Sequence, residues 1–161
     1  MAEFSSLNGY VVKDKKAIRY YDSVNTMKSD TTLKNGMFAK TLGYYTENDG
    51  GQAEYIIVDD NNLIEDSGNI HALKNGLFAK LIKKDTINLR QFGAYGDKTH
   101  DDYNALNNAI NYCKNNNTKL YIPIGEFLIG NNITIDFPLN VYGTFSCNNS
   151  GLINSNKKSI I

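Results

Sequence analysis

Residues 87–135 read INLRQFGAYGDKTHDDYNALNNAINYCKNNNTKLYIPIGEFLIGNNITI, and this stretch decides the fold that we expect. Its centre predicts the clearest helix of the chain, over residues 102–114, because apolar side chains recur there at helical spacing. Asp101 precedes this helix and Asp102 lies in its first turn, where a carboxylate can accept hydrogen bonds from free backbone N–H groups. A helix followed by short strands predicts the first coils of a β-solenoid, with the helix covering its open end. Around the helix we expect a strand at 87–92, a loop at 93–100, and strands at 119–123, 126–129, 133–136 and 139–142, with further strand residues at Phe145 and Leu152-Ile153.

The preceding segment, residues 33–84, predicts a small antiparallel β-module. Stretches rich in β-branched, aromatic and aliphatic residues at 37–45, 53–59 and 76–83 are separated by Asn, Asp and Gly clusters. The sequence ENDGG at 47–51 favours a hairpin turn, because glycine readily adopts positive φ. The octapeptides LKNGMFAK (33–40) and LKNGLFAK (73–80) differ at one position; the simpler interpretation is one kind of turn used twice, and an internal duplication is the alternative. The turn glycines of this module are Gly36, Gly50, Gly51 and Gly76.

Residues 1–32 predict an N-terminal segment with a short helix. The helix is expected from Asp14, as N-cap, to about Val24, with Ala17, Ile18 and Tyr21 on one side, and a second helical turn is expected at 27–30. Because so short a helix is unstable alone, we expect this segment to dock on a partner or to form a trimer. The expected organisation is therefore a docking segment (1–32), a β-module (33–84) and the solenoid start (85–161).

The composition is typical of a globular protein and excludes some partners. The 161 residues include 17 basic and 17 acidic side chains, so we expect neither nucleic acid nor an anionic membrane as partner. No apolar run approaches the roughly 18 residues that a membrane-spanning helix needs, and the first residues do not resemble a secretory signal. Two cysteines without CxxC spacing fit synthesis in a reducing cytoplasm.

The residues that could carry chemistry have structural explanations. Asp97, Asp101 and Asp102 are the only crowded carboxylates, and their positions in a loop and at a helix start favour turn formation and capping over catalysis. His100 is expected to be a solvent-exposed loop residue, and His71 has no partner at metal-ligand spacing. We therefore assign no catalytic residue, no metal site and no cofactor to this sequence.

The same stretch resembles the opening of the pectate-lyase-like superfamily of right-handed parallel β-helices. The resemblance lies in the order and spacing of Phe92-Gly93-Ala94, Gly96-Asp97 and the paired Asp101-Asp102, followed by the amphipathic helix. Lys98 and His100 depart from the glycine and threonine usual at their positions, which affects the expected geometry of the loop. The remaining matches are Ala105, Ala109-Ile110, Pro123, Gly125 and Phe127. The resemblance implies a mainly β chain: a small antiparallel β-module followed by the helix-capped start of a right-handed parallel β-helix.

Residues 34–59 and 75–82 are similar to a small β-domain that precedes β-helices in tail spikes and tail fibres of phages and prophages. This resemblance implies a structural virion component: the N-terminal attachment region of a tail spike or fibre, which presents a host-receptor-binding body. It implies self-association as a homotrimer, contact with tail or baseplate proteins, and assembly in the bacterial cytoplasm into the virion tail. Host cell-wall polysaccharide would be contacted through downstream regions. One alternative is the N-terminal part of a polysaccharide depolymerase, a lyase or hydrolase whose catalytic coils lie downstream. A carbohydrate-binding module without chemistry is the other alternative.

Overall fold

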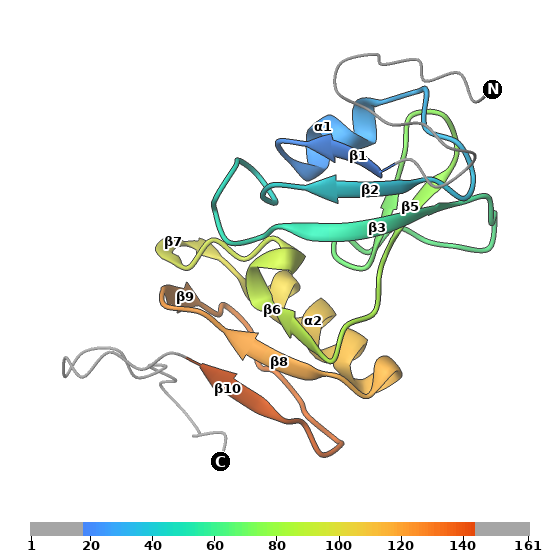
Figure 1. The fold of residues 1–161 in the computed structure, drawn as a ribbon. Helices are drawn as coiled ribbons and strands as arrows, with labels where there is room; N and C mark the ends of the chain where they lie inside the picture. The colour runs from blue at the N-terminus through green and yellow to red at the C-terminus, as the bar shows by residue number, and fades with distance from the viewer. Residues whose placement is uncertain (1–17, 144–161) are drawn as a thin grey trace, which may run out of the picture.

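The computed structural model describes residues 18–143 as two β-structures with a long helix between them (Figure 1). A five-stranded sheet comes first, and α2 then lies between it and a sheet of short strands that ends at β10. The chain is therefore mainly β, as the sequence predicts. The elements in chain order are β1 (Ile18–Tyr21), α1 (Val24–Ser29), β2 (Phe38–Thr41), β3 (Ala53–Val58), β4 (Ile70–Ala72), β5 (Phe78–Leu81), β6 (Thr86–Asn88), the 3-10 helix η1 (Leu89–Phe92), β7 (Asp97–Asp101), α2 (Tyr103–Asn116), β8 (Lys119–Ile122), β9 (Glu126–Leu128) and β10 (Val141–Gly143).

The first sheet has the strand order β1-β2-β3-β5-β4. Its pairs β2–β3, β3–β5 and β5–β4 are antiparallel, as expected, whereas β1 joins β2 in parallel. Alternation along the strands buries one face, with Ala39, Tyr55, Ile57, Ala79 and Leu81 pointing into the core. The short strand β4 was not expected, because three residues are too few for a periodic signal.

The helix predicted over residues 14–24 is wrong in its described part. Residues Ile18–Tyr21 form β1 instead, because pairing with β2 satisfies their backbone groups better than an isolated helical turn could. A helix follows at Val24–Ser29, where the Ser23 Oγ accepts a hydrogen bond from the Thr26 backbone N–H at 3.2 Å. Asp14 and Ala17, on which the prediction also depended, lie outside the described residues.

The second sheet is built from parallel strands in the order β10-β8-β6. Ile87 of β6 faces Leu120 of β8, which faces Val141 of β10, so successive stretches of chain stack in register. A second parallel pair, β7–β9, lies beside them. Short parallel strands that stack in this way are the arrangement of a β-solenoid. Three of the four strands expected after the helix are present, with shifted bounds, as β8, β9 and β10.

Residues 133–136 do not form the expected strand. Ile133 and Ile135, together with Phe137 and Leu139, are nevertheless half-buried and pack against the core, while the residues between them are exposed. The alternation that predicted a strand is therefore real, but no neighbouring backbone pairs with it among residues 18–143. The strand residues expected at Phe145 and Leu152-Ile153 lie outside the described residues.

One hydrophobic core connects the two β-structures. The expected boundary near residue 84 falls between β5 and β6, yet buried residues from both sides belong to a single cluster. Helix α2 contributes its apolar face to this cluster and packs against η1 and β8. The largest fully buried side chains are Tyr55, Met27, Ile57, Ile87, Leu89, Leu120 and His71.

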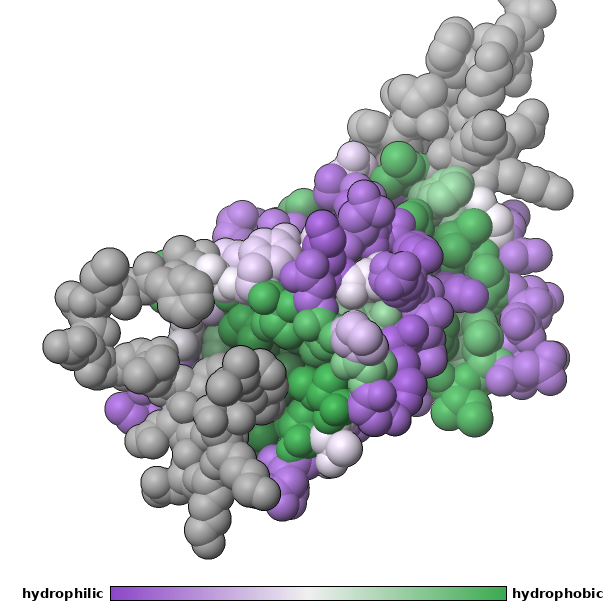
Figure 2. All heavy atoms as spheres, turned by 90° about the horizontal axis from the view of Figure 1, so that it is seen from below, coloured by the Kyte–Doolittle hydropathy of each residue, from purple (hydrophilic) through white to green (hydrophobic). Residues whose placement is uncertain are grey.

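Apolar side chains remain exposed at the β10 end of the molecule. Figure 2 views the protein from this end and shows apolar surface gathered there. Ile124 is 63% exposed, and Leu128, Val141 and Tyr142 are each about half exposed. No helix within residues 18–143 has the length and apolar composition to cross a membrane.

Candidate functional site

The loop between η1 and α2 contains the sequence motif on which the resemblance depends. η1 begins with a capping box: the Asn88 side chain accepts from the Arg90 N–H at 3.0 Å, and Gln91 Oε1 accepts from the Asn88 N–H at 2.9 Å. Phe92 and Gly93 end the helix. After this cap, residues 89–92 form a 3-10 helix, whereas the sequence predicted that the strand would continue to residue 92.

Phe92 and Gly93 anchor the loop to α2 and to the segment between β2 and β3. The Phe92 ring is buried, with its centroid 5.6 Å from that of Tyr112 on α2. Gly93 has φ of 83°, and a Cβ at this position would lie 2.8 Å from the Tyr44 ring. Glycine is therefore required here both for its backbone conformation and for the close approach of Tyr44.

Asp102 is the buried centre of the loop. Its side chain is 1% exposed and accepts hydrogen bonds from the backbone N–H groups of Tyr95 at 2.6 Å and Gly96 at 3.0 Å. Asp102 itself occupies the N-cap position of α2 but makes no side-chain capping bond, because its carboxylate points back to the preceding loop. Asp102 therefore holds the loop against the start of the helix, whereas the sequence predicted that it would cap the helix.

Asp101 links α2 to the next coil. Its Oδ1 accepts hydrogen bonds from the Tyr103 N–H at 2.9 Å and the Gly130 N–H at 3.0 Å. These two donors, Gly130 first, hold the pKa of the Asp101 carboxyl below its usual value. Asp101 thus supplies the helix-start hydrogen bond and also ties a later turn to it.

Asp97 organises the outer part of the loop. Its Oδ1 accepts from the His100 N–H at 3.0 Å and the Thr99 N–H at 2.9 Å, and its Oδ2 lies 2.7 Å from His100 Nδ1. The backbone donors, His100 first, hold the pKa of Asp97 well below its usual range. Residues 97–100, expected as loop, form the irregular strand β7 together with Asp101, and this strand pairs in parallel with β9.

Three rings form a stack on the loop surface. The Tyr45 and Tyr95 centroids are 4.2 Å apart, and those of Tyr95 and His100 are 4.0 Å apart, with nearly parallel planes in both pairs. The Tyr45 hydroxyl donates to the Gly93 carbonyl at 2.8 Å. His100 is exposed, as expected, but it is held by this stack and by Asp97, and it serves as packing rather than as a free loop side chain.

Arg90 ties the loop to the second coil. Its Nη1 donates to the Tyr95 carbonyl at 2.7 Å and its Nη2 donates to the Ile124 carbonyl at 3.2 Å. Its guanidinium carbon lies 5.9 Å from the Phe127 ring centroid. Phe127 also closes over Gly96, where φ is 61° and a Cβ would lie 2.8 Å from the ring.

The turn glycines of the β-module serve two different purposes. Gly36, Gly50 and Gly76 have φ of 85°, 88° and 84°. Gly36 and Gly76 take the same conformation in the two related octapeptides, in agreement with one kind of turn used twice. Gly51 has no positive φ and is instead buried, with a virtual Cβ 2.6 Å from Tyr44 Cβ.

The sequence did not indicate that His71, considered there only as a metal ligand, is buried. His71 on β4 is 1% exposed and lies between the rings of Tyr44 and Tyr55, with centroids 6.0 and 5.3 Å away. Its Nε2 has no hydrogen-bond partner within residues 18–143, and its Nδ1 is 4.0 Å from Glu65 Oε1. Burial, reinforced by Lys28, lowers the pKa of His71 to about 4.

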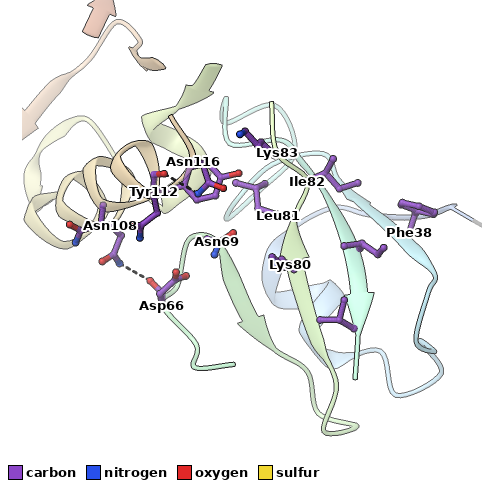
Figure 3. A pocket seen from close by; sticks show the side chains of 14 residues that line it. Phe38, Asp66, Asn69, Lys80, Leu81, Ile82, Lys83, Asn108, Tyr112 and Asn116 are labelled. Atoms are coloured by element: carbon purple, nitrogen blue, oxygen red, sulfur yellow. Dashed lines mark hydrogen bonds between the residues drawn. The ribbon is translucent and has the colours of Figure 1, made fainter. Parts of the chain in front are cut away.

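A groove lies between α2 and the outer face of the five-stranded sheet (Figure 3). We call it the amide groove; its volume is about 810 Å³. The groove was not predicted, although asparagines at positions 108, 111 and 115 are spaced for one helix face and could have indicated it. Its lining includes four asparagines of α2, Asn69, Lys80 of β5, Lys83 just after β5 and the outward side chains of β2 and β3.

The crowded carboxylates are engaged with the backbone of the loop. Asp97, Asp101 and Asp102 each accept two backbone N–H groups and so help to hold the loop. Within the described range, no group of three or more His, Cys, Asp or Glu side chains is placed to hold a metal ion. The loop is arranged as a structural connection between two coils.

Comparison with known proteins agrees with this description. Residues 86–157 match the family model described as rhamnogalacturonase A/epimerase, pectate lyase-like. The C-terminal part of the chain is therefore similar to a pectate-lyase-like family. Its matched residues include the loop, α2 and the parallel strands β6, β8 and β10. No curated protein matches the sequence.

Solved structures show the same fold over a larger part of the chain. The tailspike gp49 of Acinetobacter baumannii bacteriophage Fri1, a capsular polysaccharide depolymerase, matches 66% of this chain with a TM-score of 0.60 and 18% identity. The tailspike of Acinetobacter phage vB_ApiP_P1 matches 78% with a TM-score of 0.60 and 19% identity. WceF of Pantoea stewartii, a glycan biofilm modifying enzyme with a tailspike-like parallel β-helix, matches 67% with a TM-score of 0.56 and 19% identity. The matched region covers 16–22% of these chains, so this chain corresponds to a small part of such proteins.

Proposed function

We propose that this chain is the N-terminal attachment region of a phage tail spike or tail fibre, a structural virion component that presents a host-receptor-binding body. The observation that carries the proposal is the parallel ladder β6–β8–β10, which follows directly on a compact β-module and shares its core. The half-exposed strand β10 and the apolar surface at that end provide a base on which further coils can stack. In this role α2 covers the first coil, residues 1–32 dock on tail or baseplate proteins, and the protein is assembled in the bacterial cytoplasm into the virion tail.

The proposal is tested by locating the parent protein on virions. Antibodies raised against this 161-residue chain are expected to label the tail end of intact phage particles in electron micrographs. A virion of a mutant phage lacking the gene, complemented with an unrelated protein, serves as the unlabelled control. Labelling absent from intact particles but present in the soluble fraction of the lysate would contradict a virion role.

A homotrimer is the assembly that we propose for this region, since symmetry about an axis suits attachment to a tail. Ile18 and Tyr20 support it: they are 48% and 53% exposed on β1, which is the edge strand of its sheet. Light scattering after size exclusion should give three times the 18.0 kDa chain mass. Replacing Ile18 and Tyr20 together by Lys should shift the mass toward the monomer.

Ile64→Lys is the control for the trimer, because Ile64 is 82% exposed in a loop and its replacement likewise puts a lysine in place of an exposed apolar side chain. This variant should keep the mass of the unmodified chain. A chain that is monomeric at every concentration, or a trimer that the double variant leaves intact, would refute this assignment.

The second candidate function is the N-terminal part of a polysaccharide depolymerase with catalytic coils downstream. It is favoured by the fold of gp49 and WceF, which are described as a capsular polysaccharide depolymerase and a glycan-modifying enzyme. The full-length parent protein, incubated with purified host polysaccharide, distinguishes the two. Release of oligosaccharides would support the depolymerase, and unchanged polymer length would favour a purely structural and binding role.

A further inference from the structure

The amide groove has two walls of different chemistry. One wall is the side of α2 that carries Asn108, Asn111 and Asn115. The other is the outward face of the five-stranded sheet, together with the chain that leaves β5 (Figure 3). The scaffold role does not use this groove, because the loop, the ladder and the β10 end all lie elsewhere. It therefore calls for a separate explanation.

The helix wall offers amide groups that the protein itself does not engage. Asn108 is fixed, since its Nδ2 donates to the Asp66 carbonyl at 2.6 Å (Figure 3). Asn111 and Asn115 are exposed, and within residues 18–143 their side chains make no hydrogen bond. Each of these amides can donate and accept at once, which matches the hydroxyl groups of a sugar.

The sheet wall provides an apolar row that ends in a cation. Phe38 of β2 faces Ile56 of β3, and Ile56 faces Lys80 of β5, so the three side chains form a line across the strands. The half-buried ring of Phe38 and the side chain of Ile56 offer a flat apolar surface against which the C–H face of a sugar ring can pack. Sheet and helix thus combine the two kinds of contact that a saccharide needs.

The charge of the groove favours an anion. Lys80 and Lys83 line it, both are exposed, and neither has an ion-pair partner among the described residues. Asp66 is the one acidic lining residue, and its Oδ1 already accepts from the N–H groups of Gly68 at 3.0 Å and Ile70 at 2.8 Å. Two unpaired lysines and one carboxylate leave the lining of the groove with a net positive charge.

We propose that the amide groove binds an acidic oligosaccharide. Asn111 and Asn115 hydrogen-bond its hydroxyl groups, Phe38 and Ile56 pack against its rings, and Lys80 and Lys83 pair with its carboxylates. A nucleic acid is disfavoured, because two cations on a chain of zero net charge give little phosphate neutralisation. The groove volume of about 810 Å³ lies in the range of small-ligand sites and accommodates a short oligosaccharide.

The test is calorimetric titration of the 161-residue chain with a panel of uronic-acid tetrasaccharides and with neutral tetrasaccharides of the same length. We expect binding of at least one acidic probe, weakened by added salt, and no binding of its neutral counterpart. Lys80→Gln with Lys83→Gln should weaken binding roughly tenfold or more. Asn111→Ala with Asn115→Ala should have a similar effect through lost hydrogen bonds.

The matched control is Lys34→Gln with Lys74→Gln, which removes two exposed lysines outside the groove. It should leave the affinity within about twofold of the unmodified chain. Because all these residues are exposed, the variants should unfold at unchanged temperature, which separates lost binding from lost folding. Failure of every acidic probe to bind, equal loss in groove and control variants, or a self-association that the groove variants abolish would overturn the proposal. None of these outcomes bears on virion labelling, so the groove and the proposed function are tested independently.

Discussion

Replacing Asp102 by Asn is expected to lower the free energy of unfolding by about 3 kcal/mol. The carboxylate is 1% exposed and accepts two backbone hydrogen bonds, from Tyr95 and Gly96. Asparagine has the same shape, but its amide nitrogen cannot accept, so one backbone N–H faces a donor and loses its partner. Chemical denaturation should show a lower midpoint with an unchanged slope, and the melting temperature should fall by roughly 6–12 °C.

Asp101→Asn is the matched control for Asp102→Asn. Asp101 also accepts two backbone hydrogen bonds, from Tyr103 and Gly130, but its side chain is exposed, so water can replace the lost partner. The control should cost about 1 kcal/mol or less. Equal losses in the two variants would show that burial does not set the importance of Asp102, and that its role in the loop is no greater than that of an ordinary surface cap.

The sequence predicted those parts of the fold whose signals are local and repeated. Helix α2 was found because its apolar residues recur over several turns, and β3 because six alternating residues suffice for a strand. β1 was mistaken for a helix because Ile18 and Tyr21 also fit a helical face, and four residues cannot separate the two periods. What decides its state is parallel pairing with β2, a contact that no local pattern encodes.

The candidate sites likewise include some features that a local sequence signal predicted and others that form only on folding. The motif located Asp101 and Asp102, but it did not show which backbone groups each carboxylate binds. That difference depends on the backbone conformation at Asp102, where the carboxylate points away from the helix. The amide groove joins α2 to β2, β3 and β5, which are separate segments of the chain, so it exists only after folding. His71 gave no signal, because a single histidine in an apolar stretch does not reveal whether its ring is solvated.

Lowering the pH from 6.5 to 4 is expected to destabilise the protein by about 3 kcal/mol through His71. Burial lowers the pKa of His71 to about 4 in the folded protein, compared with 6.5 for an ordinary histidine. Above pH 6.5 the ring is neutral in both states and the full stability is present. As the pH falls through this window the unfolded chain takes up a proton that the folded protein does not, so unfolding becomes progressively easier. Urea denaturation at intervals of half a pH unit measures this slope.

His71→Phe should abolish the slope between pH 6.5 and 4, because phenylalanine keeps an aromatic ring between Tyr44 and Tyr55 without a titrating group. The chain has only two histidines, so His100→Gln is the natural control and should retain the slope. Below pH 4 all variants should still lose stability, since hydrogen bonds hold the pKa values of carboxyls such as Asp30 and Asp49 below their usual range. These groups stabilise the fold only while ionised, so their contribution disappears on the acid side of the histidine window. A slope that survives in His71→Phe and disappears in His100→Gln would contradict the prediction, because it would assign the pH dependence to the exposed histidine and not to the buried ring.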